Sequence, residues 1–332
     1  MSAKPRILLL FTGGTISMTI VPGRGAIPSR GGREILAAVK GIEAHAEVEI
    51  EDFDRLPGPH WTPSRMEDLA REIDRRMAEE GLAGAVVTHG TDTLEETAFF
   101  LDLVLNTRKP VVLTGAMKTF DDPVWDGPGN LLAAIRTAAA PDAAGRGVLV
   151  AMDDTVHAAR HVEKGHTEAF SAFTSGDAGP VAIVDWDGVH FRVAPGPRLR
   201  AATDRLEPEV ALVPTGIGVD SRPIRAALDD GARGIVIEAM GRGNVPPAMI
   251  DGVRAARDLN VPVVIASRCH RGRTAPRYGY EGGGSTLRDL GVVFSGGLPA
   301  SKARILLMAL LGAGTRGEAI REAFEGTPGA AC

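Results

Sequence analysis

The stretch Val86–Thr97, VVTHGTDTLEET, decides the fold, because it joins a β-branched strand to a helix through a single turn. The turn, HGTDT at 89–93, places hydroxyl groups and one carboxylate at the end of that strand. In open α/β sheets, ligands bind beyond the carboxyl ends of the strands. The HGTDT turn is therefore the first candidate for a functional site. Its Asp92 has a structural alternative, because a carboxylate at a helix N-terminus is also stabilised as a cap.

A second turn of the same kind, Thr12-Gly13-Gly14-Thr15, follows the first apolar run of the chain. The glycine pair lets the backbone turn tightly and approach a ligand closely, which leaves Thr15 just past the strand end. The alternatives are a simple tight turn and a phosphate loop, but neither usual glycine-rich phosphate pattern is present. Two hydroxyl-rich turns at two strand ends favour acyl transfer with threonine as the nucleophile.

The composition is that of a globular enzyme. A chain of 332 residues exceeds one compact core, so we expect two domains. The net charge is −5 and no basic block stands out, which predicts no nucleic-acid partner. No stretch approaches the roughly 18 apolar residues of a membrane span, and the run Ile7–Phe11 is too short for a signal peptide. Two cysteines, Cys269 and Cys332, make no disulfide framework, and we expect free thiols in a cytoplasmic protein.

Short apolar runs alternate with amphipathic segments, which predicts an α/β fold with parallel sheets. Runs such as AVVTHG and PVVLTG lack polar alternation, as expected for strands covered on both faces. The clearest helix is Pro63–Glu80, with Thr62 as N-cap and Gly81 as its end. The predicted strands are Arg6–Phe11, Ala46–Glu51, Ala85–Thr88, Pro110–Thr114, Gly147–Met152, Val181–Asp185, Val210–Pro214, Gly234–Ala239, Val261–Ser267 and Val292–Ser295.

An aperiodic segment with three prolines, HFRVAPGPRLRAATDRLEPE at 190–209, separates the two halves of the chain. We therefore predict a larger N-terminal α/β domain at 1–192, with a mostly parallel sheet flanked by helices. A linker at 193–210 and a smaller, flavodoxin-like α/β domain at 211–332 complete the predicted organisation.

Other polar residues have competing interpretations. Lys164 in HVEKGHTEAF can act as a base only where its surroundings favour the neutral amine, and a lone lysine is usually solvated. His157 and His161 have the spacing of one helix face, with His166 nearby, but a third zinc ligand is not evident and we predict no metal. Asn244 in GRGNVPP is explained by helix capping.

Taken together, the motifs resemble the bacterial-type L-asparaginase and glutaminase-asparaginase family over nearly the whole chain. The pair formed by the first two motifs is highly specific. The resemblance rests on TGGTI at 12–16, VVTHGTDTLEET at 86–97, LTGAM at 113–117, DGPGNL at 126–131, Lys164, GRGN at 241–244 and SGGLPASKARILL at 295–307.

The resemblance implies a catalytic set. Thr15 corresponds to the primary nucleophile, which forms an acyl-enzyme and releases ammonia. Thr91 with Lys164 corresponds to a second hydroxyl and its base, and Asp92 to the group that holds the substrate α-amino group. Ala116 lies where the family binds the released amide.

The resemblance also implies substrate-binding residues around this set. Backbone N–H groups of the HGTDT turn, including Gly90, would stabilise the oxyanion, and Gly14 belongs to the same substrate-binding group. Asn244 and Glu281 correspond to residues that reach the site of a neighbouring subunit, which makes a homo-oligomer, dimer or tetramer, the expected assembly.

Three features depart from the family pattern. Residues 16–45 contain no tyrosine where the family carries a mobile-loop tyrosine, and Tyr280 is one conceivable substitute. The serine pair expected near 53–55 is replaced by Phe-Asp-Arg, so Asp54 is expected to point elsewhere while Arg55 or the Gly58 N–H binds the α-carboxylate. Finally, Glu281 matches the corresponding residue of the family only if about three extra residues precede the next strand.

We therefore expect an amidohydrolase that converts L-asparagine to L-aspartate and ammonia, with no cofactor, no metal and no membrane or nucleic-acid partner. The alternatives within enzymes are a related amide: L-glutamine, D-asparagine or a substituted amide. From other classes, a non-catalytic amino-acid sensor on the same fold and a nucleotide-binding protein remain open.

Overall fold

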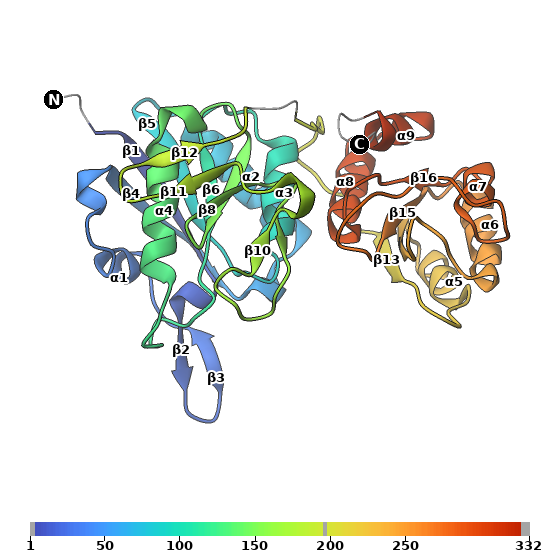
Figure 1. The fold of residues 1–332 in the computed structure, drawn as a ribbon, viewed down its shortest axis with the longest axis horizontal. Coiled ribbons are helices and arrows are strands. Elements are labelled where there is room, and N and C mark those ends of the chain that lie inside the picture. The colour runs from blue at the N-terminus through green and yellow to red at the C-terminus, as the bar shows by residue number, and fades with distance from the viewer. Residues whose placement is uncertain (1–3, 195–197, 327–332) are drawn as a thin grey trace. The chain divides into compact units, whose positions relative to one another are not determined.

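The computed structural model describes residues 4–194 and 198–326. The chain divides into two compact units, Met1–Arg198 and Leu199–Cys332 (Figure 1). The division falls within the predicted linker at 193–210, of which residues 195–197 lie outside the described residues. Cys269 is an exposed free thiol, and Cys332 lies outside the described residues.

One large sheet forms the centre of the N-terminal unit. Its strands are β1 (Arg6–Gly13), β4 (Glu47–Leu56), β5 (Leu82–Thr88), β6 (Val111–Thr114), β7 (Val148–Met152), β8 (Thr155–Ala158), β11 (Ala182–Val184) and β12 (Val189–Phe191). They lie in the order β12-β11-β8-β7-β6-β5-β1-β4. The neighbouring strands β7, β6, β5, β1 and β4 pair in parallel, whereas β8, β11 and β12 join the sheet through antiparallel pairs. The predicted mostly parallel sheet is confirmed.

The strand order contains a reversal that determines where a ligand can bind. From β1 the chain runs outward to β4, and it then returns to the other side of β1 to form β5, β6 and β7. Ligands of open α/β sheets bind outside the carboxyl ends of the strands at such a switch point. The two hydroxyl-rich turns lie at the carboxyl ends of the strands that flank the reversal: 12–15 includes the last residues of β1, and 89–93 follows β5.

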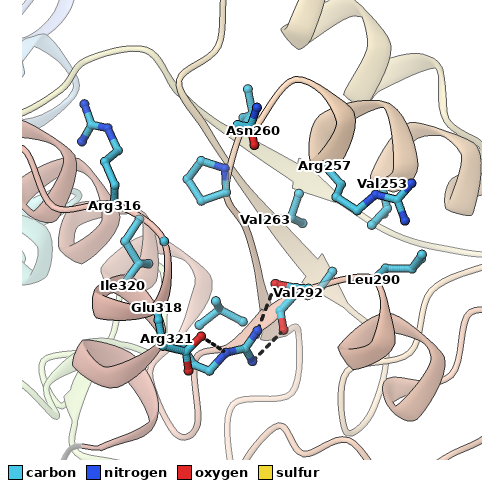
Figure 2. Close-up of a pocket in the computed structure, with 15 residues that line it drawn as sticks. Val253, Arg257, Asn260, Val263, Leu290, Val292, Arg316, Glu318, Ile320 and Arg321 are labelled. Carbon is cyan, nitrogen blue, oxygen red and sulfur yellow. Dashed lines mark hydrogen bonds and ion pairs between the residues drawn. The ribbon is translucent and has the colours of Figure 1, made fainter.

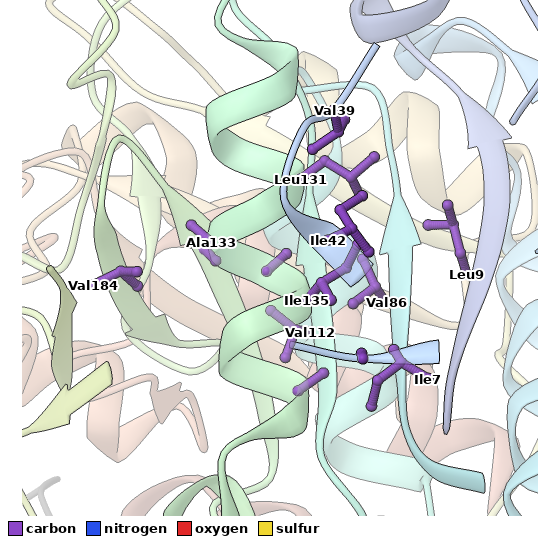
Figure 3. Close-up of a cluster of buried hydrophobic side chains, with 14 of the residues drawn as sticks. Ile7, Leu9, Val39, Ile42, Val86, Val112, Leu131, Ala133, Ile135 and Val184 are labelled. Atoms are coloured by element: carbon purple, nitrogen blue, oxygen red, sulfur yellow. The ribbon is translucent and has the colours of Figure 1, made fainter. Parts of the chain in front are cut away.

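Helices cover the sheet and explain its apolar strands. They are α1 (Gly32–Ala37), α2 (Pro63–Met77), α3 (Leu94–Val104) and α4 (Gly127–Ala139). Ile7, Leu9 and Phe11 belong to one buried cluster with Leu131 and Ile135 of α4 (Figure 3). The intervening residues of β1 are also fully buried. Both faces of β1 are therefore covered, which accounts for its continuous apolar run.

The predicted helix after Thr62 begins as expected and ends early. Thr62 Oγ1 accepts a hydrogen bond from Arg65 N–H at 3.3 Å, as an N-cap does. The helix ends at Met77 rather than at Glu80. Gly81, with φ +88°, lies in the turn that leads into β5.

Several short strands have no clear signal in the sequence. The segment after Thr15 contains a hairpin of β2 (Met18–Val21) and β3 (Gly25–Pro28), and a second pair joins β9 (Glu163–Lys164) to β10 (Phe173–Thr174). The first hairpin is anchored because Asp121 Oδ2 accepts from Ile20 N–H at 2.8 Å.

The C-terminal unit has a four-stranded parallel sheet, as predicted. Its strands, β13 (Val210–Pro214), β14 (Gly234–Ala239), β15 (Val263–Ser267) and β16 (Val293–Phe294), lie in chain order. The order reversal typical of flavodoxin-like sheets is therefore found in the N-terminal sheet, not in this one. The helices are α5 (Arg222–Asp229), α6 (Ile250–Asp258), α7 (Gly284–Asp289), α8 (Ala300–Gly312) and α9 (Glu318–Glu325). Among the described residues, no helix has the length and apolarity to cross a membrane.

The buried contact between α4 and the sheet predicts a measurable stability loss. Ile135→Ala is expected to lower the free energy of unfolding by about 2–5 kcal/mol, because it removes fully buried methyl groups and leaves a cavity. Urea unfolding of the variant measures this. The control Leu259→Ala, at a position that is 62% exposed, is expected to change it by less than about 0.5 kcal/mol. Equal shifts for the two variants would contradict this account of the core.

Candidate active site

Glycine backbones bring the two hydroxyl-rich turns together. A Cβ atom added at Gly14 would lie 2.6 Å from the nitrogen of Gly90, and one added at Gly90 would lie 2.5 Å from the nitrogen of Gly58. No side chain fits at such distances, so only glycine permits this close approach. The turns after β1 and β5 and the segment after β4 therefore meet in backbone contact, at the switch point of the sheet.

Two of the threonines in these motifs tie the strands together. Thr12 Oγ1 donates to the carbonyl of Thr88 at 2.5 Å, and Thr12 N–H donates to Thr88 Oγ1 at 3.2 Å. Both residues are fully buried. Their hydroxyls are used to fix β1 against β5, and the Thr93 hydroxyl donates to the carbonyl of Gly58. This leaves Thr15 and Thr91 as the hydroxyls of the two turns that are available for chemistry.

Lys164 meets the second turn through its ammonium group. Its Nζ lies 2.9 Å from Thr91 Oγ1 and 2.6 Å from Asp92 Oδ1. The side chain of Lys164 is 16% exposed and that of Asp92 is 59% exposed. The alternative of Lys164 as a solvated surface lysine is therefore wrong. Asp92 does not cap α3 either, since the N-cap position belongs to Thr93 and the carboxylate faces Lys164.

The backbone of Lys164 is held by a residue that the sequence did not single out for this purpose. Glu95 Oε2 accepts from Lys164 N–H at 2.6 Å. Lys164 also pairs with Phe173 in the β9–β10 ladder. Glu95 stands in the first turn of α3, so the helix that follows the HGTDT turn also fixes the strand that carries the lysine. An open hollow of about 330 Å³ borders this group, lined by Asp92, Glu95, Lys164, Gly165, His166 and Thr167.

Thr15 begins a single turn of 3-10 helix, Thr15–Ser17, after Gly14. Gly14 N–H donates to the carbonyl of Leu56 at 2.9 Å, and the carbonyl of Gly14 accepts from Ser17 Oγ at 2.8 Å. Within the described part of the chain, the Thr15 hydroxyl has no hydrogen-bond partner. Thr15 is half-buried, and its neighbour Gly14 contacts the backbone of Gly90. The fold therefore places the Thr15 hydroxyl, which is free to form a hydrogen bond, one residue from the contact between Gly14 and Gly90.

Ala116 lies in the turn that follows β6 and is fully buried. A Cβ atom added at the preceding Gly115 would lie 2.6 Å from the carbonyl of His89 and 3.3 Å from Thr91 Cγ2. The Gly115–Ala116 turn therefore packs directly against the Thr91 turn.

His89 is a buried, neutral support for the same turn. Its ring lies 4.4 Å from that of Trp61, centroid to centroid, and burial lowers its pKa to about 4. Its Nδ1 lies 2.9 Å from the carbonyl of Gly90, which can only accept, so Nδ1 carries the hydrogen. This bond fixes the orientation of the peptide that leads into Thr91.

The segment predicted to bind the α-carboxylate divides into two parts. The carboxylate of Asp54 forms an ion pair with Arg65 of α2, so Asp54 does point elsewhere. The guanidinium of Arg55 approaches Gly31, at 3.3 Å from the position of a Cβ added there. By contrast, Gly58 reaches the site, since its carbonyl accepts from Thr93 Oγ1 at 2.9 Å.

Asn244 and Glu281 come together within the C-terminal unit. Val245 N–H donates to the carbonyl of Gly282 at 2.9 Å, so the residues that follow each of them are neighbours. Asn244 is not a helix cap: it bridges to Met240, and α6 starts only at Ile250. Its Oδ1 is buried and has no hydrogen-bond partner among the described residues. Tyr280 lies in the same loop and is 55% exposed.

His157 and His161 do not form the pair on one helix face that their spacing allows. His157 lies on strand β8, where its ring nitrogens contact Thr155 Oγ1 at 2.9 Å and Ser175 Oγ at 2.8 Å. His166 Nδ1 accepts from the N–H groups of Glu168 and Ala169. In the part of the chain that the structure describes, no group of three or more His, Cys, Asp or Glu side chains is arranged to hold a metal ion.

A separate hollow of about 540 Å³ lies in the C-terminal unit (Figure 2). It borders Val263 and Val293 at the amino ends of β15 and β16, the sheet edge opposite Asn244. Its Arg321 donates to the carbonyls of Gly291 and Val292. Because this arginine already satisfies backbone groups, the hollow is a weaker candidate site than the Lys164 group.

Residues 6–196 match the family model described as "Asparaginase, N-terminal", and residues 209–324 match "Glutaminase/Asparaginase C-terminal domain". The chain belongs to the asparaginase family. Its membership covers both units, including the loop residues Asn244 and Glu281 of the second.

Relatives of this asparaginase-family chain match it over nearly its full length. The "Probable L-asparaginase" of Deinococcus radiodurans is 42% identical over 97% of this chain and 98% of its own. A relative from Methanosarcina mazei, named as a component of the glutamyl-tRNA(Gln) amidotransferase, is 30% identical over 93% of this chain and 74% of its own. A solved structure, titled "Probable Cytoplasmic L-asparaginase from Campylobacter jejuni", superposes with a TM-score of 0.87 at 30% identity, over 97% of this chain and 99% of that one.

The burial of His89 predicts a pH-dependent loss of stability. The ordinary histidine pKa is 6.5, and burial lowers the pKa of His89 to about 4. Between these values the unfolded chain binds more protons than the folded one, so stability falls as the pH falls from 6.5 to 4. The expected contribution of His89 is about 3 kcal/mol.

Urea unfolding across this pH range tests the prediction. The variant His89→Asn, whose amide can replace the Nδ1–H donor, is expected to lose that part of the slope. An identical pH dependence in the variant and the parent protein would show that His89 is not responsible.

Proposed function

We propose that this member of the asparaginase family hydrolyses the side-chain amide of L-asparagine to L-aspartate and ammonia through a threonine acyl-enzyme. The observation that carries the proposal is the ammonium of Lys164, which contacts both Thr91 Oγ1 and Asp92 Oδ1. A lysine bound to a hydroxyl and a carboxylate is suited to move protons to and from that hydroxyl. An amino-acid sensor would need the carboxylate but has no use for this lysine–threonine pair.

In the first half-reaction, the Thr15 hydroxyl attacks the side-chain carbonyl carbon of asparagine. The proton of the Thr15 hydroxyl passes to the Thr91–Lys164 pair, which delivers it to the amide nitrogen. The C–N bond then breaks, ammonia leaves and an ester to Thr15 remains. In the second half-reaction, water activated by the same pair attacks the ester, releases aspartate and restores the Thr15 hydroxyl. The atoms balance with water as the only co-reactant, so no cofactor or metal is invoked.

The negative charge on the carbonyl oxygen needs donors in both steps. Backbone N–H groups of the HGTDT turn are the proposed donors, because the contact of Gly90 with Gly14 and Gly58 holds this turn rigid. Losing one such donor commonly reduces the rate by about 10²–10³.

Substrate recognition is assigned to groups around Asp92. Its side chain is 59% exposed, so the carboxylate can bind the α-ammonium of the substrate while it contacts Lys164. For the α-carboxylate, Gly58 is better placed than Asp54 or Arg55, because it packs on the Gly90 turn.

Related amides are the second candidate. The M. mazei relative belongs to an amidotransferase by name, and the segment after β4 lacks the expected serine pair. One methylene, the difference between asparagine and glutamine, is worth only about 1–3 kcal/mol, so glutamine is included among the test substrates.

We further propose a homo-oligomer in which Asn244 and Glu281 complete the site of a neighbouring subunit, and a cytoplasmic location. The name of the C. jejuni structure supports the location, whereas the Haemophilus influenzae relative, 33% identical, is named as periplasmic. Nucleic-acid and membrane partners form no part of the proposal.

Ammonia release from L-asparagine, L-glutamine, D-asparagine and N-substituted asparagines tests the reaction. Thr15→Ala and Thr91→Val are each expected to lower kcat for the preferred substrate by roughly 10³ or more, because they remove the nucleophile and the proton-relaying hydroxyl. Trapping of a covalent acyl-enzyme by mass spectrometry is expected in the parent and not in Thr15→Ala. The control is Ser29→Ala, which deletes a hydroxyl at the base of the β2–β3 hairpin and is expected to retain activity.

Near-parental rates in Thr15→Ala would remove that residue from the mechanism. Turnover of only an N-substituted or D-amide would reassign the substrate while keeping the chemistry. No turnover of any amide would favour the sensor.

Dilution tests the shared site. Activity per protomer is expected to fall over the same concentration range in which the oligomer dissociates, measured by light scattering and ammonia release. Mixing Thr15→Ala with Asn244→Ala protomers is expected to restore part of the activity, because each variant carries the half-site that the other lacks. Full activity in a proven monomer would contradict the proposal.

A further inference from the structure

Asp126 occupies a helix N-cap position but does not cap its helix. An N-cap aspartate usually accepts hydrogen bonds from N–H groups in the first turn of the helix. Here Asp126 precedes α4, and its side chain makes no such bond within the described chain. Its carboxylate instead accepts from Met117 N–H, at 2.9 Å to Oδ2, and from Lys118 N–H, at 2.9 Å to Oδ1. The carboxylate is therefore used to hold the turn after β6.

Asn130, one turn further along α4, holds the other side of the same turn. Its amide group donates to the carbonyl of Gly115 at 3.1 Å and to Asp126 Oδ2 at 2.9 Å, and its Oδ1 accepts from Asp153 N–H at 3.0 Å. The residue is 4% exposed. The amide nitrogen and the oxygen thus both have partners, so a buried polar group is satisfied within the protein.

These contacts enclose Ala116. Asn130 fixes the carbonyl of the preceding residue, Gly115, and Asp126 fixes the N–H of the following residue, Met117. The carbonyl of Ala116 itself has no hydrogen-bond donor among the described residues. On the other side of the turn, Gly115 packs against Thr91: a Cβ atom added at Gly115 would lie 3.3 Å from the Thr91 methyl carbon. The turn can therefore present one unoccupied backbone acceptor beside the Thr91 hydroxyl.

We infer that Asp126 and Asn130 are positioning residues that aim the Ala116 carbonyl at the departing amide nitrogen of the substrate. The inference rests on the proposed amide hydrolysis. A carbonyl oxygen can accept a hydrogen bond from the N–H of an amide but not from an ester oxygen, which carries no hydrogen. The pair therefore matters for substrates with an N–H on the leaving group and matters little for those without one.

Steady-state kinetics with two leaving groups test this. Asn130→Asp keeps the size of the side chain but cannot donate to Gly115, and Asp126→Asn loses acceptor capacity for the two backbone N–H groups. Each is expected to lower kcat/KM for L-asparagine by about 10²-fold, the cost of a misplacement of about 1 Å. For the β-methyl ester of L-aspartate, both are expected to retain kcat/KM within about threefold.

Thr137→Val is the matched control, because Thr137 is a buried hydroxyl of the same helix whose partner is the Ala133 carbonyl. It is expected to leave both substrates unaffected. Thermal unfolding identifies the variants that fold, and the comparison uses those. Equal losses for amide and ester, or no loss for either, would overturn the inference. Failure of the proposed function is distinguishable, because the parent protein would then turn over neither substrate in a Thr15-dependent way.

Discussion

The contact of Gly14 with Gly90, and of Gly90 with Gly58, is the constraint on which the rest of the site depends. A Cβ atom at either of the first two positions would lie within 2.6 Å of backbone on the facing turn. Because the three backbones are in contact, the turns that carry the hydroxyls of Thr15 and Thr91 cannot separate without losing this packing at the carboxyl ends of the strands. The sheet contributes to this rigidity through the buried Thr12–Thr88 pair just inside the turns.

Around this contact, each polar group is held by a second element. Lys164 comes from a short β-ladder, and Glu95 of α3 binds its backbone, so the helix after Thr91 also sets the distance between lysine and threonine. The turn with Ala116 is held from α4 in the same manner. Positioning by rigid helices and strands lets a small group of side chains keep a fixed geometry.

The C-terminal unit adds residues of a different kind. Asn244 and Glu281 stand on loops at the carboxyl edge of a sequentially ordered parallel sheet, joined by the Val245–Gly282 hydrogen bond. Among the residues that the structure describes, the buried Oδ1 of Asn244 finds no donor. Unsatisfied buried groups of this type carry a cost in stability, which is consistent with a role outside the fold of that unit.

By itself the sequence determined the alternation of strands and helices, the mostly parallel sheets and the two hydroxyl-rich turns, because apolar periodicity and glycine are local signals. Only the tertiary structure decided which residues meet. Lys164 lies 73 positions from Thr91, and no local pattern encodes their contact. The carboxylate of Asp126 binds the backbone of another segment instead of capping its own helix, and His157 lies on a strand and not on a helix. In both cases, contacts with distant parts of the chain outweigh the local sequence pattern. Strand order, which is set by packing over the whole sheet, converted separate motifs into one site.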